Sequence, residues 1–203
     1  MTETVSTTID LIRHGEPEGG RKYRGHSDDP LCERGWTQMR QAVGEHRPWD
    51  AVLSSPLRRC CDFARGLAER HALPLEIDAR WMELGFGEWE GLTAAEIMAT
   101  DPERLARFWA DPIRHAPPGG ERLETFRERV VGAWNDLLAR HAGRHVLIVA
   151  HAGTIRMVTS HALDMPLASL FRLHVPYAGI TRVRVDASGA DLFPRLMFHA
   201  GTL

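Results

Sequence analysis

The sequence predicts an α/β fold: a three-layer α/β/α sandwich with a mostly parallel central sheet and a helical insertion over the carboxyl edge of that sheet. Short apolar, β-branched runs at residues 9–13 and 146–150 read as buried parallel strands, and each ends at a histidine followed within two residues by glycine. Strand and helix patterns alternate between the two runs, which favours a parallel sheet. His14 and His151 are therefore expected to share the sheet edge at which open α/β folds bind ligands.

The first half of the chain carries the alternation. A turn-like stretch at residues 27–30 precedes an amphipathic pattern over residues 31–46, which predicts a helix. Residues 50–54 read as a strand. Residues 56–71 place apolar side chains at helical spacing, and residues 75–77 read as a further short strand.

Residues 80–119 break this alternation with glycine-rich and proline-rich stretches and short helix patterns at 93–99 and 102–109. We expect an insertion that forms part of a substrate pocket. An apolar stripe predicts a helix over residues 121–141, and a helix at 154–163 follows the second histidine-bearing strand. Strands are predicted at 180–185 and 192–198, where Pro194 limits pairing. Residues 1–203 are predicted to form a single domain.

Composition narrows the function classes. A formal net charge of −2 and a pI of about 6.6 provide no overall field for nucleic acid or an anionic membrane. Residues 1–8 do not resemble a leader, and no apolar run approaches the roughly 20 residues that cross a bilayer. We therefore expect a soluble cytoplasmic protein. Cys32, Cys60 and Cys61 fit neither a disulfide framework nor a zinc site, and no metal or other cofactor is expected.

Arg13 and His14 combine two kinds of chemistry at the end of the first strand. An arginine offers a planar fork of donors for phosphate oxygens, and a neutral imidazole can act as a nucleophile. Gly15 lets backbone and ligand approach closely. This pattern indicates phosphoryl transfer to histidine, and an arginine in a surface ion pair beside a core histidine explains the same residues as well.

Three further segments extend the pattern. Residues 55–59 read Ser-Pro-Leu-Arg-Arg where a strand meets a helix, residues 83–91 read Glu-Leu-Gly-Phe-Gly-Glu-Trp-Glu-Gly, and residues 151–156 read His-Ala-Gly-Thr-Ile-Arg. With Arg-His-Gly-Glu at residues 13–16, the chain resembles the histidine phosphatase (phosphoglycerate mutase-like) superfamily. That family carries Arg-His-Gly-Glu, Ser-x-Leu-x-Arg, an acidic residue before an aromatic-Gly-acidic-Trp-Glu-Gly stretch, and His-x-Gly in the same order.

The resemblance implies a role for each matching residue. His14 is the expected nucleophile that forms a phosphohistidine, and Arg13, Arg59 and His151 are expected to surround the phosphoryl group. The Ala152 amide, at a helix N-terminus, is a further expected phosphate donor. Several fixed cationic donors supply the charge that a metal ion supplies in other phosphoryl-transfer sites.

Glu83 is the expected general acid, because the family acid stands at that offset from the glycine-aromatic stretch. A surface loop glutamate is the alternative, and Glu88 and Glu90 are nearby rivals. The chain departs from the family pattern at Pro17 and Gly20, where many members have threonine and asparagine. One expected phosphate donor is therefore missing.

Within the superfamily, the chain looks like the α-ribazole-5′-phosphate phosphatases of cobalamin nucleotide-loop assembly. The resemblance rests on residues 24–31, 86–90, 108–109 and 117–121, and on the compact length. Arg24 and His26 are candidate substrate contacts from a basic loop. Phe86 and Trp109 are candidates for stacking on a flat base such as a benzimidazole, although ordinary packing explains these aromatic residues too.

Three functions remain open at this point. The first is a metal-independent phosphomonoesterase, a hydrolase for a small phosphorylated metabolite. The second is a mutase that moves phosphate between hydroxyl groups of its substrate. The third is a non-catalytic protein that binds a phosphorylated ligand. A homodimer is compatible with all three.

Overall fold

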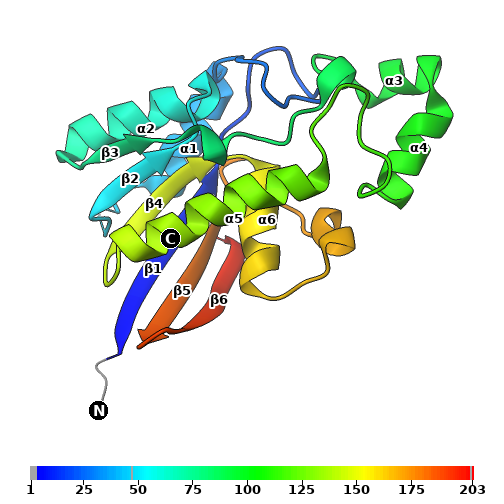
Figure 1. Cartoon of the computed structure of the whole chain (residues 1–203). Helices are drawn as coiled ribbons and strands as arrows, with labels where there is room; N and C mark the ends of the chain where they lie inside the picture. Colours follow the sequence, from blue (N-terminus) through cyan, green and yellow to red (C-terminus); the bar gives the residue numbers. More distant parts are fainter. Residues whose placement is uncertain (1–3, 47, 202) are drawn as a thin grey trace.

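The computed structural model describes residues 4–46, 48–201 and 203. Within this part of the chain, six strands form one sheet in the order β3-β2-β4-β1-β5-β6 (Figure 1). They are β1 (Val5–Arg13), β2 (Ala51–Ser54), β3 (Leu75–Ile77), β4 (His145–Ala150), β5 (Ile180–Ser188) and β6 (Asp191–Gly201). Strands β1 to β4 pair in parallel, whereas β5 and β6 are antiparallel additions at one edge. The predicted mixed α/β fold is confirmed.

Helices cover both faces of the sheet. In Figure 1, α1 (Glu33–Val43) and α2 (Arg58–His71) lie behind it, and α5 (Leu123–Arg140) and α6 (Ala152–Ala162) lie in front. Strand β1 supplies both interfaces: Ile9 and Leu11 pack with the α5 and α6 side, and Ile12 packs with the α1 and α2 side. Each such fully buried side chain contributes roughly 1.5–3 kcal/mol. Burial on two faces explains why β1 and β4 are continuous apolar runs.

The expected insertion lies beyond the carboxyl end of the parallel strands (Figure 1). It contains the short 3₁₀ helices Ala79–Trp81 and Gly87–Trp89, then α3 (Ala94–Thr100) and α4 (Pro102–Ala110). Thr93 caps α3 through a reciprocal pair of hydrogen bonds with Glu96, and Asp101 caps α4. Trp89, Ile97, Leu105 and Phe108 form a small apolar cluster that holds these helices together.

Element boundaries differ from the sequence prediction in several elements, α1, α6 and β6 among them. Helix α1 is shorter than the predicted 31–46. Helix α6 begins at Ala152, two residues earlier than predicted, which makes His151 its N-cap residue. Strand β6 runs through Pro194, which lies opposite Val185. A proline is tolerated there because β6 is the edge strand and has no partner on its outer side in the described sheet.

A buried carboxylate fixes β1 against its neighbours. Asp10 is 0% exposed and accepts hydrogen bonds from Trp49 at 2.9 Å and from both Nε and a terminal nitrogen of Arg182 at 2.7 and 2.9 Å. His145 Nε2 lies 2.9 Å from the same carboxylate. Burial raises the pKa of Asp10, but these hydrogen bonds outweigh burial and the pKa is lowered. The Asp10 carboxylate therefore keeps its negative charge, and the hydrogen bonds compensate that charge.

We expect Asp10→Ala to lower the free energy of unfolding by about 3–5 kcal/mol, because Arg182 and Trp49 lose a buried partner. Urea unfolding followed by circular dichroism measures this change. Asp136→Ala is the matched control, since Asp136 forms an ion pair with Arg80 on the surface, and such pairs contribute about 0–1 kcal/mol. Equal effects of the two substitutions on the free energy of unfolding would contradict a stabilising role for the buried Asp10 carboxylate.

Candidate active site

His14 and His151 meet at the carboxyl edge of the sheet. Strands β1 and β4 are paired neighbours, with Arg13 opposite Ala150, so the residue after each strand enters the same space. The two imidazole centroids are 5.2 Å apart, in an edge-on arrangement. Residues separated by most of the chain are therefore brought together as expected.

The geometry around His14 fixes which ring nitrogen is free. Nδ1 lies 2.7 Å from the Gly15 carbonyl oxygen, which only accepts, so Nδ1 carries the proton and Nε2 keeps its lone pair. Burial lowers the pKa of His14 well below its ordinary value, and the positive charges of Arg59 and Arg13 lower it further. Gly15 must lack a side chain, because a Cβ would lie 2.2 Å from the Gly35 carbonyl oxygen. His14 is therefore a neutral, oriented imidazole.

His151 is fully buried, and both of its ring nitrogens have partners. Arg59 Nε lies 3.3 Å from Nδ1, and a guanidinium only donates, so Nε2 carries the proton and donates to Ser55 Oγ at 2.8 Å. Burial, followed by Arg59 and His14, lowers the pKa of His151 well below its ordinary value. Cys60 Sγ packs 3.6 Å from Nε2. The sequence placed Ser55 only at a junction of strand and helix, and it excluded Cys60 only from a disulfide framework or a zinc site.

Arg13 and Arg59 supply positive charge without acidic partners. Arg13 donates to the Val175 carbonyl oxygen at 2.7 Å and lies 4.1 Å above the Tyr177 ring. Arg59, which is 0% exposed, donates to backbone carbonyl oxygens of Ser27 and Gly25. Among the described residues, neither guanidinium forms an ion pair with a carboxylate. One buried and one partly buried cation beside two neutral imidazoles suit an anion, because an unpaired buried charge is unfavourable.

Glu83 lies at the N-terminus of α6. Its Oε2 accepts from the Gly153 amide at 3.0 Å and its Oε1 from the Leu84 amide at 2.9 Å. A Cβ on residue 153 would lie 2.0 Å from Oε1, so any side chain there would displace the Glu83 carboxylate. Ala152 is the first residue of the same helix, and its amide is one of the first-turn donors that bind anions.

The rival carboxylates have other surroundings. Glu88 is exposed. Glu90 accepts from the backbone amides of His26 and Ser27 at 2.8 and 2.7 Å, and so holds the loop that carries His26. Arg58, next to Arg59 on α2, is exposed and pairs with Asp62.

Arg129 positions Glu83 in a way that the sequence did not indicate. From α5 it donates to the carbonyl oxygens of Met82 and Glu83, both at 2.8 Å, and it forms a two-pronged ion pair with Glu121. Thr154 Oγ1 donates to the Met82 carbonyl oxygen at 3.0 Å from α6. Glu83, the expected general acid, is therefore held between two helices. In the sequence Arg129 looks like any helix-surface arginine, because its partners are backbone oxygens from a distant loop.

Two predicted substrate contacts lie in the loop after β1. Arg24 donates to Asp29, to the Gly20 carbonyl oxygen and to the Glu18 carbonyl oxygen, so all three of its nitrogens hold the loop together. This shapes the loop rather than presenting Arg24 to a substrate. His26 is exposed and its Nε2 lies 3.1 Å from the Glu83 carbonyl oxygen, which places it beside the acid.

The predicted aromatic contacts belong to one group. Phe86 contacts Tyr23 and Phe108, and Trp109 contacts Phe108 and Phe171. Trp109 is 52% exposed and so retains a free face, whereas Phe86 is partly buried against the insertion. Packing therefore accounts for most of the Phe86 surface, and Trp109 is the better candidate for stacking.

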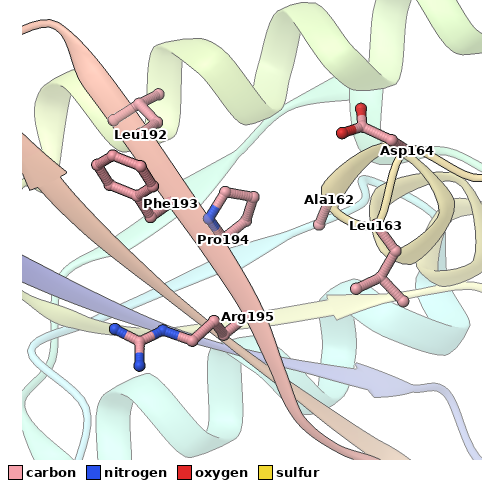
Figure 2. A pocket seen from close by; sticks show the side chains of 7 residues that line it. All are labelled: Ala162, Leu163, Asp164, Leu192, Phe193, Pro194 and Arg195. Atoms are coloured by element: carbon pink, nitrogen blue, oxygen red, sulfur yellow. The ribbon is translucent and has the colours of Figure 1, made fainter.

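A groove of about 570 Å³ lies elsewhere, between the end of α6 and β6 (Figure 2). It is lined by Ala162, Leu163, Asp164, Leu192, Phe193, Pro194 and Arg195. None of the predicted site residues lines it. In the described part of the chain, no helix is long and apolar enough to span a membrane.

Residues 9–193 match the histidine phosphatase superfamily (branch 1). The chain belongs to this superfamily. A bifunctional protein of Mycobacterium tuberculosis is 38% identical over 148 residues, which are 70% of this chain and 40% of that protein. The chain therefore spans less than half of that relative's length. Phosphoserine phosphatase 1 of Hydrogenobacter thermophilus is 32% identical over 68% of each chain. The adenosylcobalamin/α-ribazole phosphatase of Salmonella typhimurium is 34% identical over 59% of this chain and 61% of its own.

Solved structures of superfamily proteins share the fold. A mycobacterial glucosyl-3-phosphoglycerate phosphatase superposes with a TM-score of 0.86 at 29% identity, covering 97% of this chain and 100% of that one. The α-ribazole phosphatase of Shigella flexneri gives a TM-score of 0.77 at 27% identity, covering 93% of this chain and 95% of that one. These phosphatases carry different substrate names, so family membership does not identify the substrate of this chain.

We expect His14 and His151 to stay neutral as the pH falls through 6.5, because burial and two arginines lower both pKa values. Ring nitrogen shifts measured by ¹⁵N NMR between pH 8 and 5.5 test this. The His14 signals should also show the proton on Nδ1. An exposed histidine titrates near pH 6.5, and such behaviour at either site histidine would contradict the prediction.

Proposed function

We propose that this protein hydrolyses phosphate monoesters through a phosphohistidine formed on His14. The observation that carries the proposal is the free Nε2 of a neutral His14 beside Arg13 and Arg59, which have no acidic partner among the described residues. A binding protein would need the cations but not an oriented nucleophile. Membership of the histidine phosphatase superfamily supports the same reading.

The proposed reaction has two steps. In the first, His14 Nε2 attacks phosphorus, the ester P–O bond breaks, and the Glu83 carboxylic acid gives its proton to the departing oxygen. In the second, the Glu83 carboxylate takes a proton from water, the water oxygen attacks phosphorus, and the P–N bond breaks to release inorganic phosphate. Glu83 regains its proton, so the cycle closes without a cofactor.

The remaining residues stabilise the transferring group. Arg13 and Arg59 stand where charge on the phosphoryl oxygens needs fixed donors, with the Ala152 amide at the start of α6. His151 holds Arg59 in place through Nδ1, and a direct contact between His151 and the phosphoryl group stays a prediction. In this scheme the arginines supply the positive charge, and the proposal expects full activity in EDTA.

The proposed substrate is a small phosphorylated metabolite. α-Ribazole-5′-phosphate in cobalamin biosynthesis is the candidate that the sequence resemblance suggests, and the free face of Trp109 could stack on its benzimidazole. The esters named for the relatives, glucosyl-3-phosphoglycerate and phosphoserine, are the other candidates. A panel that contains all three esters, scored by release of inorganic phosphate, identifies the preferred substrate. The same measurement distinguishes hydrolysis from phosphate transfer, because only hydrolysis releases inorganic phosphate.

We expect a ³²P-labelled ester to leave label on His14 that is stable in alkali and lost in acid, with EDTA present throughout. Peptide mapping of the rapidly quenched protein locates the label. His14→Ala should carry no label and release no phosphate. His46→Ala, at an exposed histidine, should behave like the unmodified protein. Label recovered on any other residue would overturn the proposal.

Gly153→Ala should displace the Glu83 carboxylate, since the new Cβ would meet Oε1. We expect kcat/KM for alkyl phosphates to fall by about 10²–10⁴, the usual contribution of a general acid. p-Nitrophenyl phosphate should be affected far less, because its leaving group departs without a proton. Gly66→Ala is the control, as nothing lies within 4 Å of its new Cβ. An equal loss on both ester types would argue against Glu83 as the acid.

A further inference from the structure

Arg156 is a third arginine at the site, and the proposed reaction leaves it without a role. It lies on α6, three residues after Gly153 and four after Ala152. Residues at these separations share one face of a helix. A Cβ on Gly153 would point at the Glu83 carboxylate, so Arg156 is on the face of α6 that Glu83 approaches.

The side chain of Arg156 is held at one end only. Its Nε donates to the Leu173 carbonyl oxygen at 2.7 Å, and its guanidinium carbon lies 5.7 Å from the centre of the Phe171 ring. The 3₁₀ helix that carries Phe171, Leu167–Arg172, lies beside α6 (Figure 1). Among the residues that the structure describes, no carboxylate forms an ion pair with Arg156. Its two terminal nitrogens thus form a fork of donors with no acidic partner.

The electrostatic neighbours of Arg156 indicate which part of the site it faces. Burial lowers the pKa of Arg156, and the nearby Glu83 charge opposes this effect. Arg156 in turn contributes to the lowered pKa of Arg13. The charges that act most on the two imidazoles include Arg59 and Arg13 in both cases. The Arg156 guanidinium therefore lies within electrostatic range of Glu83 as well as of Arg13.

The acid marks the position of the leaving group. In the proposed reaction Glu83 protonates the ester oxygen, so the organic part of the substrate must lie on the Glu83 side of the phosphoryl group. A half-buried arginine without an acidic partner on that side matches a planar anion, because the guanidinium fork binds a carboxylate through two parallel hydrogen bonds. Binding such an anion would also compensate the unpaired charge.

We propose that Arg156 binds a carboxylate carried by the leaving group, so that the preferred substrates are phosphate esters of hydroxy acids. The inference rests on the proposed function for the direction of the leaving group. It ranks carboxylate-bearing esters above α-ribazole-5′-phosphate, whose leaving group has no acidic group. It also gives Arg156 a role in specificity that is separate from the phosphoryl contacts of Arg13 and Arg59.

Two matched pairs of esters test the proposal. O-Phosphoserine and phosphoethanolamine differ by one carboxylate, and 3-phosphoglycerate and glycerol 3-phosphate differ by a carboxylate against a hydroxymethyl group. Dissociation constants are measured by calorimetry on the full chain carrying His14→Gln, which cannot turn substrate over in the proposed scheme. Turnover of the same esters is measured with His14 intact. Binding tests the role of Arg156, and turnover tests the proposed function.

We expect the carboxylate ester of each pair to bind about 10- to 100-fold more tightly, the usual effect of a hydrogen-bonded charge pair. Arg156→Gln should remove most of this preference and leave the affinity for phosphoethanolamine within about threefold. Arg156→Lys should keep part of the preference, since it keeps the charge but not the fork. Arg127→Gln is the control: this exposed arginine on α5 acts on His161, toward the other end of α6.

The outcomes separate the two proposals. Equal affinity within each pair, or an equal loss for both esters in Arg156→Gln, would overturn the carboxylate assignment and make Arg156 a phosphoryl or structural residue. Selective binding that depends on Arg156 supports the carboxylate assignment, whether or not the protein with His14 intact releases phosphate. Absence of phosphate release would overturn only the proposed hydrolysis.

Discussion

The site depends on uncompensated positive charge held against neutral imidazoles. Arg59 is fully buried, and it donates hydrogen bonds to two backbone carbonyl oxygens and to His151. Burial lowers the pKa of both His14 and His151, and the same positive charge lowers it further, because protonation would add a third cation to the same small volume. A dianionic ligand relieves this repulsion. The proposed nucleophile and the proposed anion site thus follow from one electrostatic arrangement.

The sheet determines where that arrangement forms. Because β1 and β4 are adjacent and parallel, the residues after them emerge at one edge, and Arg13 and His14 need no long connection to reach His151. The Asp10 network fixes β1 near the middle of its length, four residues before His14. Rigid strands therefore position His14, the proposed nucleophile. The hydrogen-bonded Asp10 carboxylate within the sheet supports the site at the sheet edge, where Arg13 and Arg59 have no acidic partner among the described residues.

The sequence was sufficient for the parts of the structure that depend on local pattern. Apolar strands, helical stripes and the order of the motifs predicted the layers, and they brought His14 and His151 to one edge. The role of Arg129 could not be predicted, because it acts through backbone oxygens of a loop more than forty residues away. The same limit applies to Arg24, whose basic character suggested a ligand contact and whose three nitrogens instead bind its own loop. The periodicity of apolar residues indicates which side chains are buried, but it does not indicate the hydrogen-bond partners of a polar side chain.

The two sides of the site differ in how they are built, and this difference bears on specificity. The phosphoryl side is assembled from strand ends and the first turns of α2 and α6, which the core fixes on both faces of the sheet. The leaving-group side combines the Glu83 loop, Arg156 and the aromatic group around Trp109 and Phe171, which pack in the smaller cluster of the insertion. Changes in that cluster can alter the organic group that fits without moving His14 or Arg59. One superfamily fold can therefore carry phosphatases with different substrates, because the aromatic residues of the insertion can change while the elements that carry His14 and Arg59 stay in place.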